Sequence, residues 1–262
     1  GQRLGHGAFL DSLILDGLWD PYGDFHMGEA AERSAAELGL GRAVQDEYAR
    51  GSYERARAAT TSGAFAAEIE PVRIESKRGE TIVREDEEPT RVDLTKLPSL
   101  KPAFRKDGTI TAGNASKIND GASAVVLASA EAVRKHRLTP IARFVAHAHH
   151  AQAPEQFPTA PAFAIDKALA RAGLRTSDLD LLEINEAFAT VVLGCIQLAK
   201  LDPTRVNVRG GAVALGHPIG CSGARILTTL LYALRDRGGQ RGLATLCIGG
   251  GEANALIVER VS

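Results

Sequence analysis

The sequence predicts an α/β fold, with a mostly parallel, helix-covered sheet over residues 119–262 and a separate, surface-like region over residues 1–118. From Gly121 onward, short apolar runs alternate with longer helix-forming segments, a pattern typical of strands and helices that follow one another in a covered sheet. Before that point, charged residues and turn signals dominate. With 262 residues and 44% hydrophobic content, the chain can bury a core and form one or two domains.

Two helices are expected in the first region, over residues 28–38 and 44–59, where helix-forming residues are dense and apolar residues are few. Their narrow apolar stripes indicate a thin layer rather than a deep core. Residues 81–91 (TIVREDEEPTR) are strongly acidic and are expected to form a solvated loop.

The second region contains the expected sheet. Buried strands are expected over residues 122–128, 141–147, 179–185, 243–248 and 253–259. Helices are expected near residues 130–137 and over residues 160–172, 187–200 and 222–236. Gly173 directly follows one of these helices and suits its C-terminus, because glycine readily adopts the left-handed conformation found there.

Helices 187–200 and 222–234 are apolar on most of their faces, so they need cover on all sides. One small sheet covers a single side. The sequence therefore predicts a further layer, supplied by a second half-domain or by a partner chain.

Composition excludes several classes of protein. The net charge of −1 gives no reason to expect nucleic acid or an anionic membrane as a partner, and no apolar run approaches the length of a membrane span. The three cysteines are odd in number and widely spaced, which favours a reducing, cytoplasmic compartment over a disulfide framework. No CxxC pair is present, so no metal site is expected.

Three motifs stand at expected junctions between strands and helices. Residues 185–188 (NEAF) begin a helix, where the asparagine taken alone is most simply an N-cap. Residues 216–223 (GHPIGCSG) lead into a helix N-terminus, where glycines allow close approach of a ligand and free N–H groups favour anions. Residues 247–252 (CIGGGE) end a strand, and the glycines clear space and present amide donors beside a cysteine that would otherwise be inert core.

In this order and spacing, the three motifs resemble the C-terminal signature motifs of the thiolase family. Two upstream segments agree, since residues 26–28 (HMG) resemble the family's loop-domain motif and residues 113–116 (GNAS) resemble the return from that domain to the core. The resemblance covers the whole chain. It implies a loop domain over residues 1–118, lying over the CoA channel, and a C-terminal thiolase core half over residues 119–262.

The resemblance implies acyl exchange between CoA thioesters, by Claisen condensation or its reverse, through an acylated cysteine. Cys247 resembles the cysteine that moves the proton next to the thioester carbonyl. His217 resembles the histidine that activates the nucleophile and donates to one oxyanion, and Asn185 resembles the residue that holds a water there. The Gly249 amide resembles a donor of the second oxyanion hole. The residues that resemble the lining of the pantetheine channel or acyl pocket are Ser116, His26, Met27 and Phe188.

The family's nucleophilic cysteine stands in an N-terminal half that the sequence is expected to lack. Cys195 lies within an expected helix and Cys221 suits small packing, so neither is expected to replace it. The chain alone is therefore expected to be inactive and to need a thiolase N-terminal half, on another chain or on a segment outside this sequence. The complete enzyme is expected to be a homo-oligomer with coenzyme A and acyl-CoA as substrates and no further cofactor; acyl-chain preference stays open.

Two other functions fit parts of the sequence. A thiolase-like subunit could bind acyl-CoA or support a partner without doing chemistry, although retention of all three motifs favours an enzyme. The sequence HAHH supplies His147, His149 and His150 for a metal-dependent hydrolase. This alternative is disfavoured, because the first two share one face of a strand, the third points away, and no nearby carboxylate completes a site.

Overall fold

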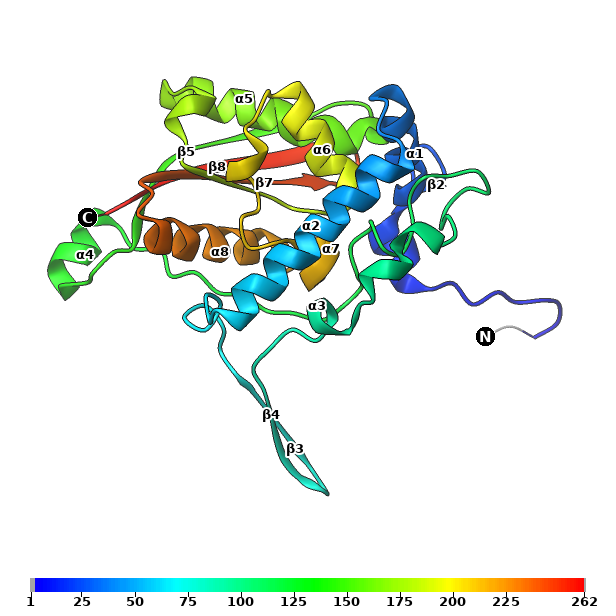
Figure 1. Ribbon diagram of the computed structural model, residues 1–262, viewed down its shortest axis with the longest axis horizontal. Helices are drawn as coiled ribbons and strands as arrows, with labels where there is room; N and C mark the ends of the chain where they lie inside the picture. The colour runs from blue at the N-terminus through cyan, green and yellow to red at the C-terminus, as the bar shows by residue number, and fades with distance from the viewer. Residues whose placement is uncertain (1–2, 262) are drawn as a thin grey trace.

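A four-stranded mixed sheet organises the chain in a computed structural model that describes residues 3–261 (Figure 1). Its strands are β5 (Ala142–Ala151), β6 (Leu181–Ile184), β7 (Arg241–Ile248) and β8 (Glu252–Arg260), in the spatial order β5-β8-β7-β6. Only β6 and β7 run parallel, while β7 with β8 and β8 with β5 are antiparallel. The α/β class is confirmed, but the strand directions are mixed rather than mostly parallel.

The antiparallel pairing of β7 and β8 arises from the glycine turn between them. Gly250 and Gly251 have φ of 82° and 86°, a conformation that side-chain-bearing residues rarely adopt. A Cβ at Gly251 would lie 2.2 Å from the carbonyl oxygen of Gln152, so this position also requires glycine for close packing. The turn reverses the chain at once, and β8 therefore returns beside β7.

Helices cover both faces of the sheet (Figure 1). α5 (Ala160–Ala172) and α6 (Ala189–Leu198) lie on one side, where they share a core with Leu243 and Ile257. α8 (Ser222–Arg237) lies on the other side and packs against Leu181 and Ala244. Because successive strand residues point to opposite faces, neighbouring residues of β7 serve the two different cores.

The predicted helix 160–172 is confirmed by α5, and Gly173 ends it with φ of 65°. The helix near residues 130–137 is confirmed by α4 (Ala130–His136), and that over residues 222–236 by α8. Short 3₁₀ turns connect the remaining elements at Pro154–Thr159, Thr176–Asp178 and Pro203–Arg205. Among residues 3–261, no helix has the length and hydrophobicity required to cross a membrane.

The first region packs onto this core through two helices. α1 (Met27–Glu37) and α2 (Arg42–Thr61) confirm the two predicted helices and contact α6. α2 also packs on the short helix α7 (Ala212–Leu215). The other elements of this region are η1 (Ile14–Leu18), β1 (Trp19–Asp20), β2 (Phe25–His26), β3 (Val72–Ser76), β4 (Gly79–Val83), α3 (Glu88–Arg91) and η2 (Leu94–Ser99).

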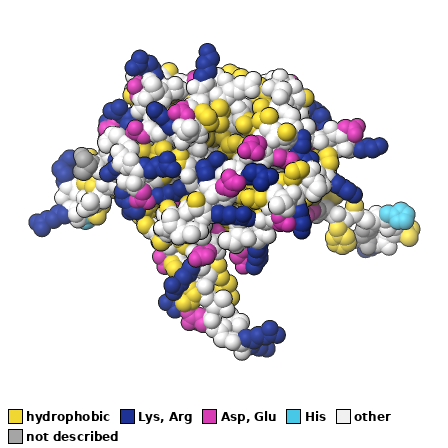
Figure 2. Space-filling view, in the orientation of Figure 1, with side chains coloured by type: hydrophobic (Ala, Val, Ile, Leu, Met, Phe, Trp, Pro, Cys, Tyr) yellow, Lys and Arg dark blue, Asp and Glu magenta, His cyan; other side chains and the backbone are white. Residues whose placement is uncertain are grey.

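Strands β3 and β4 form an antiparallel hairpin that projects from the body, with basic side chains at its tip (Figure 2). All ten residues of the two strands are exposed. The expectation of a loop over residues 81–91 is therefore wrong at both ends, because residues 81–83 belong to β4 and residues 88–91 form α3. Its solvated character agrees with the structure, apart from the buried Pro89.

Two expectations about buried elements are wrong. Residues 122–128 form no strand, and Val126 and Leu127 are 92% and 85% exposed. An apolar run becomes a strand only beside a neighbour that pairs with its backbone, and no described strand takes that place. Helix α6 finds most of its cover within the same chain, from α1, α2 and α5, although Leu198 at its end is 41% exposed. Helix α8 stays partly exposed, and Leu227 and Leu231 are only partly buried.

The buried carboxylate of Glu32 fastens the extended segment 109–110 to α1. It is 5% exposed and accepts hydrogen bonds from the backbone N–H groups of Thr109 and Ile110 and from the Thr109 hydroxyl, each at 2.9 Å. We expect Glu32→Ala to lower the free energy of unfolding by roughly 2–4 kcal/mol, since buried donors lose their acceptor. Urea unfolding followed by circular dichroism measures this.

The matched control is Glu37→Ala, at an exposed position of the same helix, which should change the free energy of unfolding by less than about 0.5 kcal/mol. Equal effects of the two substitutions would contradict the role assigned to the Glu32 carboxylate.

Candidate functional site

Residues 114–119 form a backbone seam between two of the motifs. The Ser116 N–H donates to the Ala187 carbonyl at 3.0 Å, and the His217 N–H donates to the Lys117 carbonyl at 3.0 Å. The seam thus places the NEAF motif on one side and the GHPIG motif on the other. Gly216, with φ of 102°, lies so close to Asn119 that a Cβ would come within 2.2 Å of its side-chain oxygen.

Asn185 leaves the end of β6 toward this seam and is fully buried. Its N–H donates to the Thr245 carbonyl at 3.0 Å, which extends the parallel pairing of β6 and β7 by one residue. It is not a helix N-cap, because α6 begins after Phe188. Its side-chain Oδ1 has no protein hydrogen-bond partner among the described residues, although it is buried. Such an orphaned acceptor in a polar site is suited to a water or ligand donor.

His217 lies beside Asn185, with 3.2 Å between the Asn185 Nδ2 and the His217 Nε2. Its other ring nitrogen, Nδ1, is 2.6 Å from the Ser222 Oγ, and the Ser222 hydroxyl donates to the Pro218 carbonyl. Because that hydroxyl proton is already used, the network assigns the ring proton to Nδ1. Nε2 is then the basic nitrogen that faces Asn185.

The electrostatic environment keeps His217 neutral. Burial lowers its pKa to about 4, and the nearby positive charge of Arg225 acts in the same direction. A neutral imidazole at neutral pH can accept a proton from a thiol, and after it has done so its Nε2–H can donate to an oxyanion.

Cys247 stands near the end of β7, on the sheet face that α5 and α6 cover. Since Asn185 bonds to Thr245 of the same strand, strand geometry places the Asn185 and Cys247 backbones within about 8 Å of each other. Burial raises the pKa of the Cys247 thiol to about 12. Gly249 follows in the turn, and a Cβ there would have the Met27 sulfur as its nearest neighbour, at 4.0 Å.

Two of the predicted channel residues, His26 and Phe188, form an aromatic row with Phe104 next to this strand end. The His26 Nδ1 accepts from the Gly28 N–H at 3.0 Å and so caps α1. Its ring stacks on Phe104 at 4.8 Å between centroids, and Phe104 meets the edge of Phe188 at 5.9 Å. Met27, Phe188 and Cys247 belong to one buried cluster. Sequence reasoning missed Phe104, because a single aromatic in a turn-rich segment shows no periodicity.

The other two cysteines have environments that suppress thiolate formation. Burial in α6 raises the pKa of Cys195 far above its usual range, with Cys247 adding to the effect. Burial also raises the pKa of Cys221 at the start of α8. All three thiols are thus held protonated, and none has the lowered pKa of an activated nucleophile.

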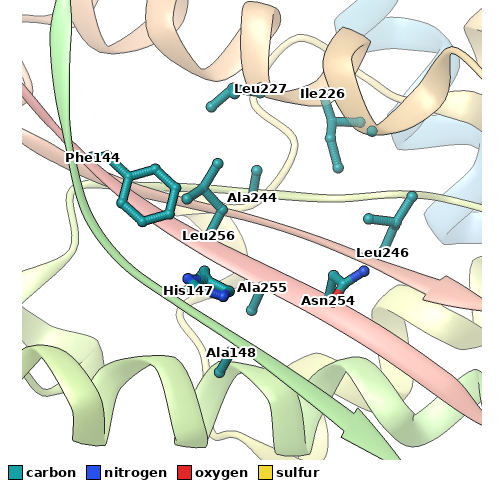
Figure 3. Close-up of a pocket in the computed structure, with 11 residues that line it drawn as sticks. Phe144, His147, Ala148, Ile226, Leu227, Ala244, Leu246, Asn254, Ala255 and Leu256 are labelled. Carbon is teal, nitrogen blue, oxygen red and sulfur yellow. The ribbon is translucent and has the colours of Figure 1, made fainter. Parts of the chain in front are cut away.

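A cavity of about 420 Å³ lies apart from these residues, on the α8 side of the sheet (Figure 3). Apolar side chains from β5, β7, β8 and α8 line it, together with His147. His150 instead pairs with Gln152 at 3.1 Å and stacks on Phe163. Across residues 3–261, no three His, Cys, Asp or Glu side chains are grouped so that they could bind a metal ion.

The depressed pKa of His217 predicts a pH dependence of stability. The imidazole titrates near pH 6.5 when unfolded and near pH 4 when folded, so protonation favours the unfolded state. We expect its contribution to stability to be fully present above pH 6.5 and to decline as the pH falls from 6.5 to 4. Thermal unfolding of the chain and of His217→Asn, compared between pH 4 and 8, isolates the contribution of the His217 imidazole to stability. Parallel curves for the two proteins would contradict the assignment.

Comparison with protein families matches both parts of the chain. The model described as "Thiolase, N-terminal domain" matches residues 1–131, and "Thiolase, C-terminal domain" matches residues 138–260. The expectation that the chain holds a loop domain and C-terminal half only is therefore wrong, because both family domains are represented.

Individual relatives agree. Acetyl-CoA acetyltransferase B, mitochondrial, of Xenopus laevis is 52% identical over 253 residues, which are 96% of this chain and 60% of the relative. The crystal structure of the Bacillus anthracis acetyl-CoA acetyltransferase has a TM-score of 0.96 at 44% identity and that of human mitochondrial 3-ketoacyl-CoA thiolase has 0.92 at 38%. All of this chain and 66% of each solved chain are covered. The chain spans about 60% of the length of the Xenopus relative and belongs to the thiolase family.

Proposed function

We propose that this chain carries the histidine–asparagine–cysteine part of a thiolase-type acyltransferase, which exchanges acyl groups between CoA thioesters. The contact between His217 and Asn185 at 3.2 Å, one strand away from Cys247, is the observation that carries the proposal. The names of the Xenopus and Bacillus relatives support acetyl transfer in particular. The substrates are coenzyme A and acyl-CoA, and the proposal needs no further cofactor.

In the cleavage direction, the neutral His217 Nε2 takes the proton of an acyl-accepting thiol, and the thiolate attacks the 3-keto carbon. The bond between C2 and C3 breaks, and its electron pair passes to C2 of the leaving acetyl-CoA. Cys247, which stays a protonated thiol at neutral pH, donates its proton to that carbon. The thiol of CoA then gives its proton to the Cys247 thiolate and attacks the acyl thioester. The acyl-CoA leaves, and the released nucleophilic thiolate recovers its proton from the His217 Nε2.

The remaining predicted residues have supporting roles in this proposal. Protonated His217 and a donor held by Asn185 stabilise one oxyanion, and the Gly249 amide stabilises the other, each worth about 3–4 kcal/mol by analogy with other oxyanion holes. Residues that line the channel for the pantetheine and acyl groups are Ser116, His26, Met27 and Phe188.

We propose that the acyl-accepting thiol comes from outside these 262 residues, on another polypeptide or another segment. All three cysteines are buried and held protonated, and residues 1–131 contain no cysteine. The chain alone is therefore expected to cleave acetoacetyl-CoA at background rate. Loss of the enolate absorbance of acetoacetyl-CoA in the presence of CoA measures this. A burst of turnover by the chain alone would assign the nucleophile to Cys195, Cys221 or Cys247.

A chimera tests the function directly. The 262 residues replace the matching 66% of the Bacillus anthracis enzyme, so that the remainder of that chain completes the site. We expect CoA-dependent cleavage of acetoacetyl-CoA, and a loss of roughly 100-fold or more in kcat for His217→Ala or Cys247→Ala, since each removes a proton-transfer group. A folded, CoA-binding chimera without turnover would overturn the proposal and leave a binding role.

We also propose that the chain functions as part of a larger assembly, packed against further thiolase polypeptide and as a homo-oligomer. It exposes 14801 Å², whereas a compact monomer of 27.7 kDa exposes about 11,000 Å². Part of the excess is apolar, including Val126 and Leu127. We expect light scattering to report species heavier than 27.7 kDa, and Val126→Asp with Leu127→Asp to reduce them. A monodisperse, cooperatively melting monomer would contradict the proposal.

A further inference from the structure

Glu186, the second residue of the NEAF motif, has an unusually complete set of donors for a fully buried carboxylate. Its Oε1 accepts from the Tyr48 hydroxyl at 2.7 Å and from the Asn207 Nδ2 at 3.0 Å. Its Oε2 accepts from the Ser52 hydroxyl at 2.7 Å and from the Val213 N–H at 3.0 Å. Both oxygens are therefore satisfied by protein groups alone, which is the condition for keeping a carboxylate in a core.

These donors come from three segments that are distant in sequence. Tyr48 and Ser52 stand one turn apart on α2, so the carboxylate fastens that helix to the core. Val213 lies in the first turn of α7, which ends at Leu215, and only Gly216 separates that helix from His217. On its other side, Glu186 follows Asn185 in the chain. A single carboxylate thus links α2 to both residues of the His217–Asn185 contact.

The surrounding residues are shaped for this carboxylate. A Cβ at Gly211 would lie 2.4 Å from its carboxyl carbon, so only glycine fits there. The Asn207 Oδ1 accepts from the Ile184 N–H and its Nδ2 also donates to the Ile184 carbonyl, both at 2.8 Å, which fixes the end of β6 one residue before Asn185. Burial and the negative charge of Glu186 raise the pKa of Tyr48, so its phenol stays protonated and donates.

We propose that Glu186 is a positioning residue: its carboxylate sets the placement of Asn185 relative to His217 and couples that placement to helix α2. This proposal concerns the same site as the acyl-transfer function, and its predicted effect on turnover rests on that function. The positioning itself is a statement about this chain and can be measured without turnover.

Replacement by glutamine is a sharp probe, because the amide keeps the shape and loses one acceptor. The Asn207 Nδ2 and the Val213 N–H can only donate, and they contact different oxygens of Glu186. Whichever way the glutamine is turned, its NH₂ group faces one of these two donors. The hydroxyls of Tyr48 and Ser52 can rotate to adapt, but the other two groups cannot.

Glu183 supplies a matched control three residues earlier. It is 1% exposed, and neither of its oxygens has a hydrogen-bond partner among the described residues. Burial raises its pKa to about 8, so at neutral pH it is largely a neutral acid. Glu183→Gln therefore replaces one neutral, unpartnered group by another of the same shape and removes no donor–acceptor pair.

The first measurement uses the 262-residue chain with ¹⁵N-labelled histidine. We expect Glu186→Gln to shift the His217 ring-nitrogen resonances and to move its pKa from about 4 toward its ordinary 6.5, because a loosened loop admits water. Glu183→Gln should leave both unchanged. Tyr48→Phe, which removes one donor and keeps the carboxylate, should give a smaller shift and covers the case in which Glu186→Gln does not fold.

The second measurement uses the active chimera. Glu186→Gln should lower kcat by roughly 10- to 100-fold, the cost of misplacing a catalytic group by about 1 Å, with KM changing less than about threefold. Unchanged His217 resonances in both Glu186→Gln and Tyr48→Phe would overturn the positioning role, whatever the turnover. If the chimera shows no turnover but the resonances shift as stated, the acyl-transfer proposal fails and the positioning role stands.

Discussion

The site depends on one hydrogen bond, in which the Asn185 N–H donates to the Thr245 carbonyl. It prolongs the parallel pairing between β6 and β7, and parallel strands end at the same edge. The NEAF motif therefore begins at the same edge of the sheet at which β7 ends, one strand away from Cys247. Antiparallel pairing of these two strands would place the two motifs at opposite edges. The mixed direction of the remaining strands does not disturb this arrangement, because β5 and β8 lie on the far side of β7.

A buried charged group needs hydrogen-bond partners, and the two buried carboxyl groups near the site, Glu186 and Glu183, differ in this respect. Glu186 has four donors, whereas Glu183 on the same stretch has none and responds by a raised pKa. The two carboxyls thus differ in their hydrogen-bond partners although both are buried. Removing the hydrogen-bond donors of Glu186 therefore costs free energy. Replacing Glu183, which has no hydrogen-bond partner among the described residues, by a neutral group of the same shape does not.

Much of the core could be predicted from sequence because its signals are local. The helix over residues 160–172 has an amphipathic pattern and a glycine that fits its end, and β7 and β8 flank a glycine turn. The strand predicted over residues 122–128 does not form, because a strand needs a neighbour that pairs with its backbone. Composition does not encode such a neighbour. The exposed β3–β4 hairpin was also missed. Val72 and Ile74 alternate with charged residues, but the two strands are only five residues long and bury nothing.

The site was predictable to the level of motifs and no further. His217 and Asn185 were identified as partners of one oxyanion hole by resemblance, and the structure brings them into contact. The residues that support them were not identified. Ser222, Tyr48 and Asn207 are ordinary polar residues whose roles come from contacts between residues up to 159 apart in sequence. An N-cap role for Asn185 was the simplest local interpretation, but residues 186–188 separate it from the start of α6.

The protonation states of His217 and Cys247 follow from their surroundings. His217 is neutral because it is buried beside the positive Arg225, and Cys247 is neutral because it is buried without a cation in contact. A thiolate placed against the His217 Nε2 would reverse the first effect, because an opposite charge within a few ångströms raises the pKa of an imidazole. The imidazolium and thiolate would then stabilise each other in a region of low dielectric constant. In the proposed reaction, the histidine would thus become an effective base only when a thiol arrives, and proton transfer and nucleophile placement would be one event rather than two.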